Sequence, residues 1–154
     1  MKKMITLLAL VMTCQLAFCQ TYQDFFNKYK DAQGVEYIEV PQELLKMGAA
    51  QADAETKAVL ERVESIYMLQ VANPSEELSA EMLAEAKKLS QRYDKLADGE
   101  EDGETMLIYG DGEDGDHYNL LFVLHGNAEA MQIIAMKGKI SMKELEKLST
   151  MTGN

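Results

Sequence analysis

The chain has 154 residues, of which 47% are hydrophobic and 27% are charged. Such a composition is typical of a globular protein and excludes a disordered or fibrous chain, and the length fits one folded domain. The formal net charge of −11 argues against a nucleic-acid partner, because binding to phosphates relies on Lys and Arg residues that displace counterions.

The N-terminal segment has the pattern of an export signal. Two lysines precede the apolar stretch Met4–Met12, and Ala17 and Cys19 place small side chains where signal peptidase requires them. We therefore expect a signal peptide over residues 1–19, cleavage between Cys19 and Gln20, and a periplasmic or secreted protein. The apolar stretch is too short for a permanent transmembrane span.

A lipid-anchored envelope protein is the alternative, because Cys14 and Cys19 both follow the apolar stretch at a distance suited to acylation. The preceding residues, Thr13 and Phe18, are larger than such processing prefers, and the choice between the two routes stays open. Cleavage before Gln20 would leave 13 basic and 26 acidic residues, a net charge of −13, and no cysteine. The mature domain, residues 20–154, would then have no disulfide, no thiol nucleophile and no thiolate metal site.

The first part of the mature domain predicts short helices and strands in turn. Thr21 can cap a helix whose aromatic residues have helical spacing: Tyr22, Phe25, Phe26 and Tyr29. Alternating side chains then predict a strand over 35–40, and a short helix follows over 42–47. A further helical pattern changes into a strand over 65–71, with the boundary near Glu64.

The middle of the chain predicts one long helix. Asn73 and Pro74 have the character of a helix cap and a first helical residue. Apolar side chains at helical spacing continue to Leu96, so we expect a helix over 74–96 that covers one face of a sheet.

The last third predicts strands over 105–109, 117–124 and 129–137, joined as an antiparallel meander. Ser141 and Glu144 then form a capping box for a final helix. Together these elements predict an α+β domain with a single, mainly antiparallel sheet of about five strands and helices packed on one face.

Four hydrophobic motifs follow the signal segment: Phe25-Phe26-x-x-Tyr29, Val35-Glu36-Tyr37-Ile38, Glu104-Thr105-Met106-Leu107-Ile108-Tyr109 and Gly138-x-Ile140-x-x-x-x-Leu145-x-x-Leu148. With the signal peptide, this pattern resembles the family of exported proteins from Bacteroidota named domain of unknown function DUF4252. The resemblance covers nearly the whole mature domain. It implies a small exported or lipid-anchored domain without an assigned activity, and it carries over no catalytic or binding residue.

A search for catalytic groups finds little. The two histidines, His117 and His125, lie at the ends of one predicted strand, on the same face and about 26 Å apart at about 3.3 Å per residue, which is too far for one site. No serine lies in a nucleophile elbow, and no glycine-rich phosphate loop is present. The methionines are dispersed, which favours core filling over capture of a soft metal. We expect no catalytic residue and no cofactor.

Acidity is the most distinctive local feature. Ten carboxylates fall within 23 residues: Asp94, Asp98, Glu100, Glu101, Asp102, Glu104, Asp111, Glu113, Asp114 and Asp116. The spacing of Asp98, Glu100 and Asp102 imitates the opening of a calcium loop, but Tyr109 stands where a bidentate Glu must close it. We therefore expect solvated acidic turns and no metal site.

These observations favour an exported, non-enzymatic envelope protein that binds a protein or another envelope component. The alternative is a small carboxylate-dependent hydrolase that acts on an envelope glycan or peptide. A binding module should expose an apolar patch or an unpaired sheet edge. A hydrolase should instead have a concave pocket with two buried acids of perturbed pKa. The sequence indicates neither the oligomeric state nor the identity of a partner.

Overall fold

The computed structural model describes residues 21–112 and 115–152 of the chain. The expected signal segment, both cysteines and two of the ten clustered carboxylates, Glu113 and Asp114, lie outside the described residues. Within the described ranges, no helix has the length and apolar character needed to cross a membrane.

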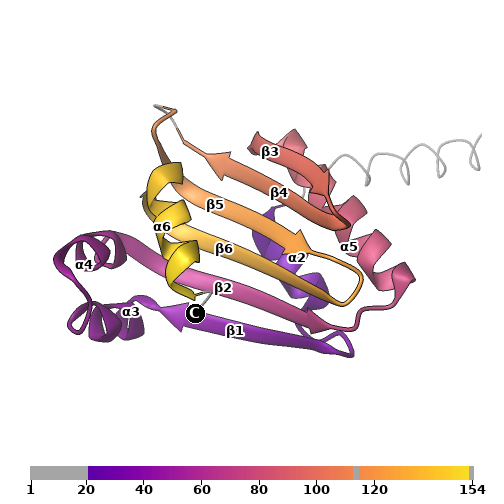
Figure 1. Cartoon of the computed structure of the whole chain (residues 1–154), viewed down its shortest axis with the longest axis horizontal. Helices are drawn as coiled ribbons and strands as arrows, with labels where there is room; N and C mark the ends of the chain where they lie inside the picture. Colours follow the sequence, from indigo (N-terminus) through magenta and orange to yellow (C-terminus); the bar gives the residue numbers. More distant parts are fainter. Residues whose placement is uncertain (1–20, 113–114, 153–154) are drawn as a thin grey trace, which may run out of the picture.

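Six strands form one antiparallel sheet in the order β1-β2-β6-β5-β4-β3 (Figure 1). Their bounds are β1 (Val35–Pro41), β2 (Val63–Ala72), β3 (Asp94–Glu101), β4 (Glu104–Asp111), β5 (His117–Gly126) and β6 (Ala130–Ser141). The α+β class and the single antiparallel sheet are confirmed, with six strands in place of about five. The last strand along the chain, β6, lies in the middle of the sheet between β2 and β5.

Five α-helices are described: α2 (Tyr22–Tyr29), α3 (Gln42–Ala49), α4 (Ala54–Leu60), α5 (Glu76–Lys87) and α6 (Met142–Thr152). Side chains of α2 and α5 pack into one core, on the face turned away from the viewer in Figure 1, which we call the back face. Side chains of α3, α4 and α6 pack into a second core on the front face. The expectation that the helices pack on one face is therefore wrong.

The reason is visible in β5, where five consecutive apolar residues run from Leu120 to Leu124. Leu120, Phe122 and Leu124 belong to the back core, whereas Leu121 and Val123 belong to the front core. A strand that is apolar on both sides has to be covered on both faces.

The back core is built around the aromatic residues of α2. Phe25 is fully buried and meets Phe122 of β5 edge to face, with ring centroids 5.3 Å apart. The helix begins at the predicted cap residue, Thr21, and the cap is a capping box: the backbone N–H of Asp24 donates to the Thr21 hydroxyl, and the Thr21 N–H donates to the Asp24 carboxylate. The cap satisfies two N–H groups that the first helical turn leaves unpaired.

Hydrogen bonds hold the first turn of α6 in place. The predicted capping box is confirmed, because the Ser141 N–H donates to the Glu144 carboxylate at 2.9 Å and the Glu144 N–H donates to the Ser141 hydroxyl at 3.3 Å. The guanidinium of Arg62, after α4, also donates to Glu144 and to the carbonyl oxygen of Lys139. Arg62 therefore connects α4, β6 and α6.

The predicted helix over 74–96 is correct only in its first half. The helix α5 begins at Glu76, with the Ser75 hydroxyl and not Asn73 as its cap. It ends at Lys87, and a 3-10 turn, η2 (Lys88–Gln91), leads into β3.

The end of the segment predicted as a helix belongs to β3, which pairs with β4. The pair closes at Asp102 and Gly103, which both have positive φ, as a two-residue hairpin turn requires. The five expected strands are all present, with ends that differ by a few residues.

Candidate functional site

The front face of the sheet carries a continuous row of apolar side chains across all six strands. In the pairing register each of these residues lies directly opposite the next, and we call the row the apolar ladder: Ile38, Met68, Ile134, Val123, Ile108 and Ala97. Neighbouring strands lie about 4.8 Å apart, so the row is about 24 Å long.

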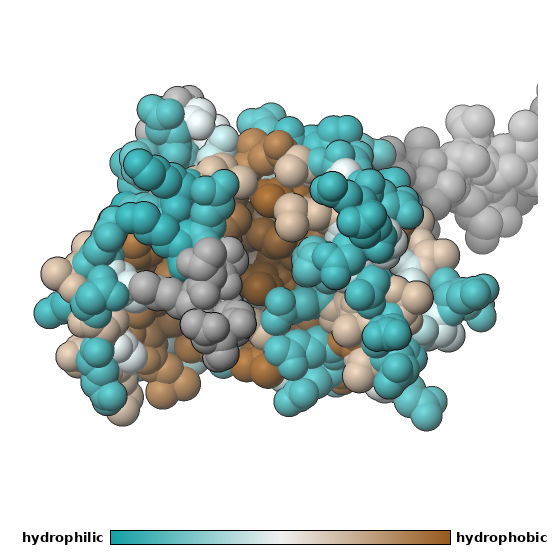
Figure 2. Space-filling view, in the orientation of Figure 1, coloured by the Kyte–Doolittle hydropathy of each residue, from teal (hydrophilic) through white to brown (hydrophobic). Residues whose placement is uncertain are grey.

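The apolar ladder is only partly covered. Met142, Leu145 and Leu148 of α6 pack on the front core beside it. Ile108 is buried, but the other five residues of the ladder are half-buried. Figure 2 shows the result as a hydrophobic hollow next to α6, with hydrophilic residues around it.

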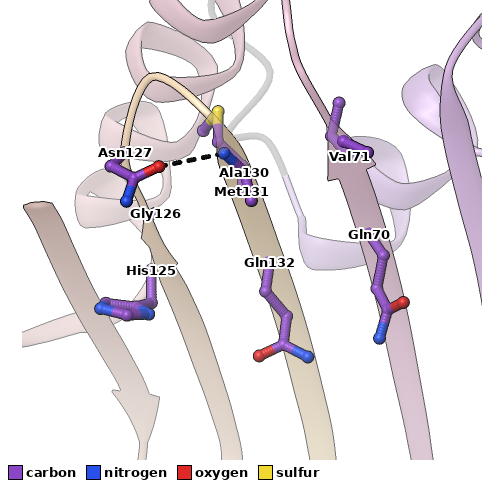
Figure 3. A pocket seen from close by; sticks show the side chains of 9 residues that line it. Gln70, Val71, His125, Gly126, Asn127, Ala130, Met131 and Gln132 are labelled. Atoms are coloured by element: carbon purple, nitrogen blue, oxygen red, sulfur yellow. Dashed lines mark hydrogen bonds between the residues drawn. The ribbon is translucent and has the colours of Figure 1, made fainter.

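A second row lies two residues further along the strands, toward the β5–β6 turn. We call it the rim ladder, and its members in register are Glu36, Gln70, Gln132, His125, Met106 and Gly99. Figure 3 shows Gln70, Gln132 and His125 side by side on neighbouring strands. Met106 is 43% exposed, which makes it one of the most exposed large apolar side chains described.

The polar groups of the rim ladder have weak or exposed partners. The side-chain amides of Gln70 and Gln132 both donate to the Met68 sulfur, at 3.2 and 3.4 Å. His125 Nε2 lies 3.2 Å from a carboxylate oxygen of Glu104, and both side chains are exposed. A thioether is a weak acceptor, so these amides could exchange it for a stronger one on a partner.

Two hollows flank the turn between β5 and β6. One, of about 370 Å³, is lined by Gln70, His125, Met131 and Gln132 among others (Figure 3). The other, of about 310 Å³, lies between this turn and the start of α5. The Asn127 side chain orders the turn by accepting the Ala130 N–H at 3.0 Å, the dashed line in Figure 3. Both volumes lie at the lower end of the range typical of ligand pockets.

The titratable groups of the described residues serve the fold. The carboxylates of Asp24 and Asp53 have lowered pKa values because backbone N–H groups at helix starts donate to them. Burial alone would raise the pKa of Glu144, but hydrogen bonds from Ser141 and Arg62 bring it below its usual value. Burial raises the pKa of Tyr29 to about 12. None of these shifts belongs to a group that faces the apolar ladder.

The residues singled out for calcium lie on a paired strand and its turn. Asp98 and Glu100 belong to β3, and Asp102 is a turn residue of the β3–β4 hairpin. An extended strand separates carboxylates that a calcium loop would gather. Among residues 21–112 and 115–152, no three His, Cys, Asp or Glu side chains are grouped closely enough to hold a metal ion.

The expectation that His117 and His125 project from the same face is wrong. A β-bulge between Tyr118 and Leu120 interrupts the alternation, so that Tyr118 packs in the front core and Leu120 in the back core. His125 therefore belongs to the front face and His117 to the back.

The two ladders were missed by the sequence analysis because they depend on register between six strands. The local signal was available in β4 and β5, where Met106, Ile108, Val123 and His125 alternate with buried residues. The predicted helix over 74–96 overlapped the start of β3 and so concealed the strand that carries Ala97, the last member of the apolar ladder.

Comparison with curated proteins gives no match, and comparison with solved structures gives none either. A family model described as Domain of unknown function (DUF4252) matches residues 29–148. The matched range contains all six strands and both ladders. The match confirms the resemblance noted from the hydrophobic motifs: the chain belongs to the DUF4252 family.

Proposed function

We propose that the protein is an exported, non-enzymatic envelope protein that binds another macromolecule through the front face of its sheet. The observation that carries the proposal is the apolar ladder, which crosses the whole sheet and is left half-open. An apolar centre with a polar rim is the usual anatomy of a protein interface. Export is supported by the sequence pattern of residues 1–19.

The dimensions of α6 explain why the face stays open. The helix has 11 residues, which makes it about 16 Å long, and a packed helix covers a strip about 10 Å wide. The apolar ladder alone is about 24 Å long. One helix of this size cannot cover the front face, and α3 and α4 pack near one end of it (Figure 1). A contiguous apolar surface that is left partly open in this way is typical of an interaction site.

The hydrolase alternative has no specific support in the geometry. It needs an acid that burial keeps protonated. Every carboxyl group within residues 21–112 and 115–148 is exposed or half-buried. Hydrolysis is therefore kept only as an alternative outcome of the experiment described next.

Site-specific photocrosslinking in the native envelope tests the proposal. A photoreactive amino acid replaces Met106, which is exposed at the front face, and in a matched control it replaces Lys88, which is exposed beside α5. We expect a discrete adduct from position 106 and none from position 88, detected by mass spectrometry.

Equal labelling at both positions, or none at position 106, would contradict binding through the front face. Turnover of an envelope glycan or peptide by the purified protein, abolished by replacement of one carboxylate, would favour the hydrolase.

A further inference from the structure

We infer that the partner segment is one amphipathic α-helix of a different protein, about 16 residues long at 1.5 Å per residue. Its apolar side lies on the apolar ladder, and its Lys or Arg residues lie beside the acidic residues at the β5–β6 turn end of the front face. This assignment rests on the proposed function and names the chemistry of its partner. Four observations carry it: the hydrogen bonding of the backbone, the direction of α6, the length of the apolar ladder and the distribution of charge.

Backbone hydrogen bonding favours a helix over an extended peptide. The strands under the middle of the apolar ladder, β2, β6, β5 and β4, are paired on both sides, so the face offers side chains and no free backbone groups. An extended peptide laid on this surface would leave its own N–H and C=O groups against apolar side chains, which is costly. A helix satisfies its backbone internally.

The direction of α6 provides the packing geometry. In Figure 1, α6 crosses the strands instead of running along them, and the apolar ladder also crosses the strands. Successive rows on one face are two residues apart along a strand, or about 6.7 Å, and packed helices lie about 8–10 Å apart. A helix over the apolar ladder and the rim ladder would therefore lie beside α6 at a normal packing distance.

The ladder also fixes the length of the docked helix. A row of about 24 Å corresponds to about 16 residues at 1.5 Å per residue. Met68 and Met106 lie where the docked helix would meet the two ladders, and methionine adapts its shape to apolar partners. A helix of this length presents four or so apolar residues at i, i+3, i+4 and i+7 spacing.

The charges on the front face determine which residues should flank the apolar side of the partner helix. Glu36, Glu101 and Glu104 are exposed on strands at the end of the front face that lies toward the β5–β6 turn, and neither ladder contains Lys or Arg. Basic residues on the partner would complement these carboxylates.

The same charges disfavour the other possible occupants. A second copy of the mature domain would carry the same net charge of −13, from 13 basic and 26 acidic residues, and would bring like charges together. An anionic membrane surface attracts basic segments, not acidic ones.

The probe is a fluorescent 16-residue peptide of Leu, Ala and Lys with its leucines on one helical face, titrated into the protein isolated from the envelope. One control peptide has the same composition with leucines spread around the helix, and another has Glu in place of Lys. We expect saturable one-to-one binding of the first peptide, and binding about tenfold weaker for each control. Equal binding of all three peptides would overturn the inference.

Matched protein variants separate docking from general attraction between opposite charges. The double variant Glu101→Lys with Glu104→Lys reverses the charge of two of the three carboxylates at the β5–β6 turn end of the front face, while Asp31→Lys with Glu77→Lys makes the same charge change at exposed positions elsewhere. We expect about tenfold weaker binding in the first variant and less than about a threefold change in the second. Circular dichroism checks that both variants stay folded. Equal losses in the two variants would contradict docking at the front face.

Three further outcomes are informative. Dimers in analytical ultracentrifugation that are lost in Met106→Lys would assign the front face to a second copy, and binding to vesicles containing phosphatidylglycerol would assign it to a membrane; either would overturn the inference. A discrete photocrosslinked adduct at position 106 together with failure of the peptide titration would refute the helical partner and leave the proposed function standing.

Discussion

Replacement of Gly138 by alanine should destabilise the protein strongly, because the backbone of β6 approaches the α4–β2 connection at this residue. A Cβ atom on Gly138 would lie 2.4 Å from the carbonyl oxygen of Arg62 and 2.7 Å from the Cα of Val63. Both are backbone atoms that cannot move aside as a flexible side chain could. The φ angle of Gly138 is also +139°, which L-residues rarely adopt.

The magnitude follows from two contributions. Overpacking of a filled site costs about 1–3 kcal/mol, and a positive φ costs a residue with a Cβ about 1–2 kcal/mol more. We therefore expect Gly138→Ala to lower the free energy of unfolding by about 3 kcal/mol, which lowers the Tm by about 10 °C in a domain of this size. Against a typical total of about 5–15 kcal/mol, this is a large loss.

Gly48→Ala is the matched control, because Gly48 lies in α3, has an ordinary helical φ and would have no atom within 4 Å of an added Cβ. Alanine is favoured over glycine in a helix by about 1 kcal/mol, so this variant should be slightly more stable. Urea unfolding followed by circular dichroism measures both variants. A Gly138→Ala protein within about 0.5 kcal/mol of the parent would refute the close approach of β6 to Arg62, given that overpacking alone should cost more.

Three further predictions concern pH, processing and metal binding. The folded-state pKa of Glu144 is lowered, so its contribution to stability is present above the unfolded-state pKa of about 4.3 and is lost as the pH falls through the lower folded value. Urea unfolding at pH 3 and pH 6 should therefore show a smaller difference in the free energy of unfolding between the two pH values for Glu144→Gln than for the parent. An equal difference would contradict the role of its hydrogen bonds. Intact-mass measurement of protein from the envelope should show a chain that begins at Gln20; retention of the first residue would remove the argument for export, and a diacylglyceryl adduct on Cys14 or Cys19 would establish the lipoprotein alternative. Isothermal titration should show no micromolar calcium site, and saturable binding that is lost in Asp98→Asn would prove this wrong.

The elements predicted correctly are those whose signals are local. Strands such as β1 were found from alternation. The cap of α2 was found from Thr21 ahead of aromatic residues at helical spacing, and the capping box of α6 was found from Ser141 and Glu144, three positions apart. These interactions form within one turn or one strand and depend little on the rest of the fold.

The errors arose where pairing between distant segments overrides local spacing. Leu89, Tyr93 and Leu96 continue the helical pattern of α5, but Leu96 lies in β3, which pairs with β4. The pair Asp102-Gly103 is a hairpin signal, and its place in an acidic run concealed it. The apolar ladder could not be read from any one segment, since its members come together only after β6 inserts between β2 and β5.

That central insertion of β6 has a consequence for biosynthesis. Until β6 leaves the ribosome, β2 and β5 each have an unpaired edge, and the two parts of the sheet, β1–β2 and β3–β4–β5, have no strand to join them. Exposed edges of apolar strands readily pair with other chains, so the nascent protein is most prone to aggregation before β6 has been synthesised. For a chain that we propose to be exported, the dependence of the sheet on β6 also keeps the polypeptide incompletely folded, and so able to be threaded, until this strand has been made.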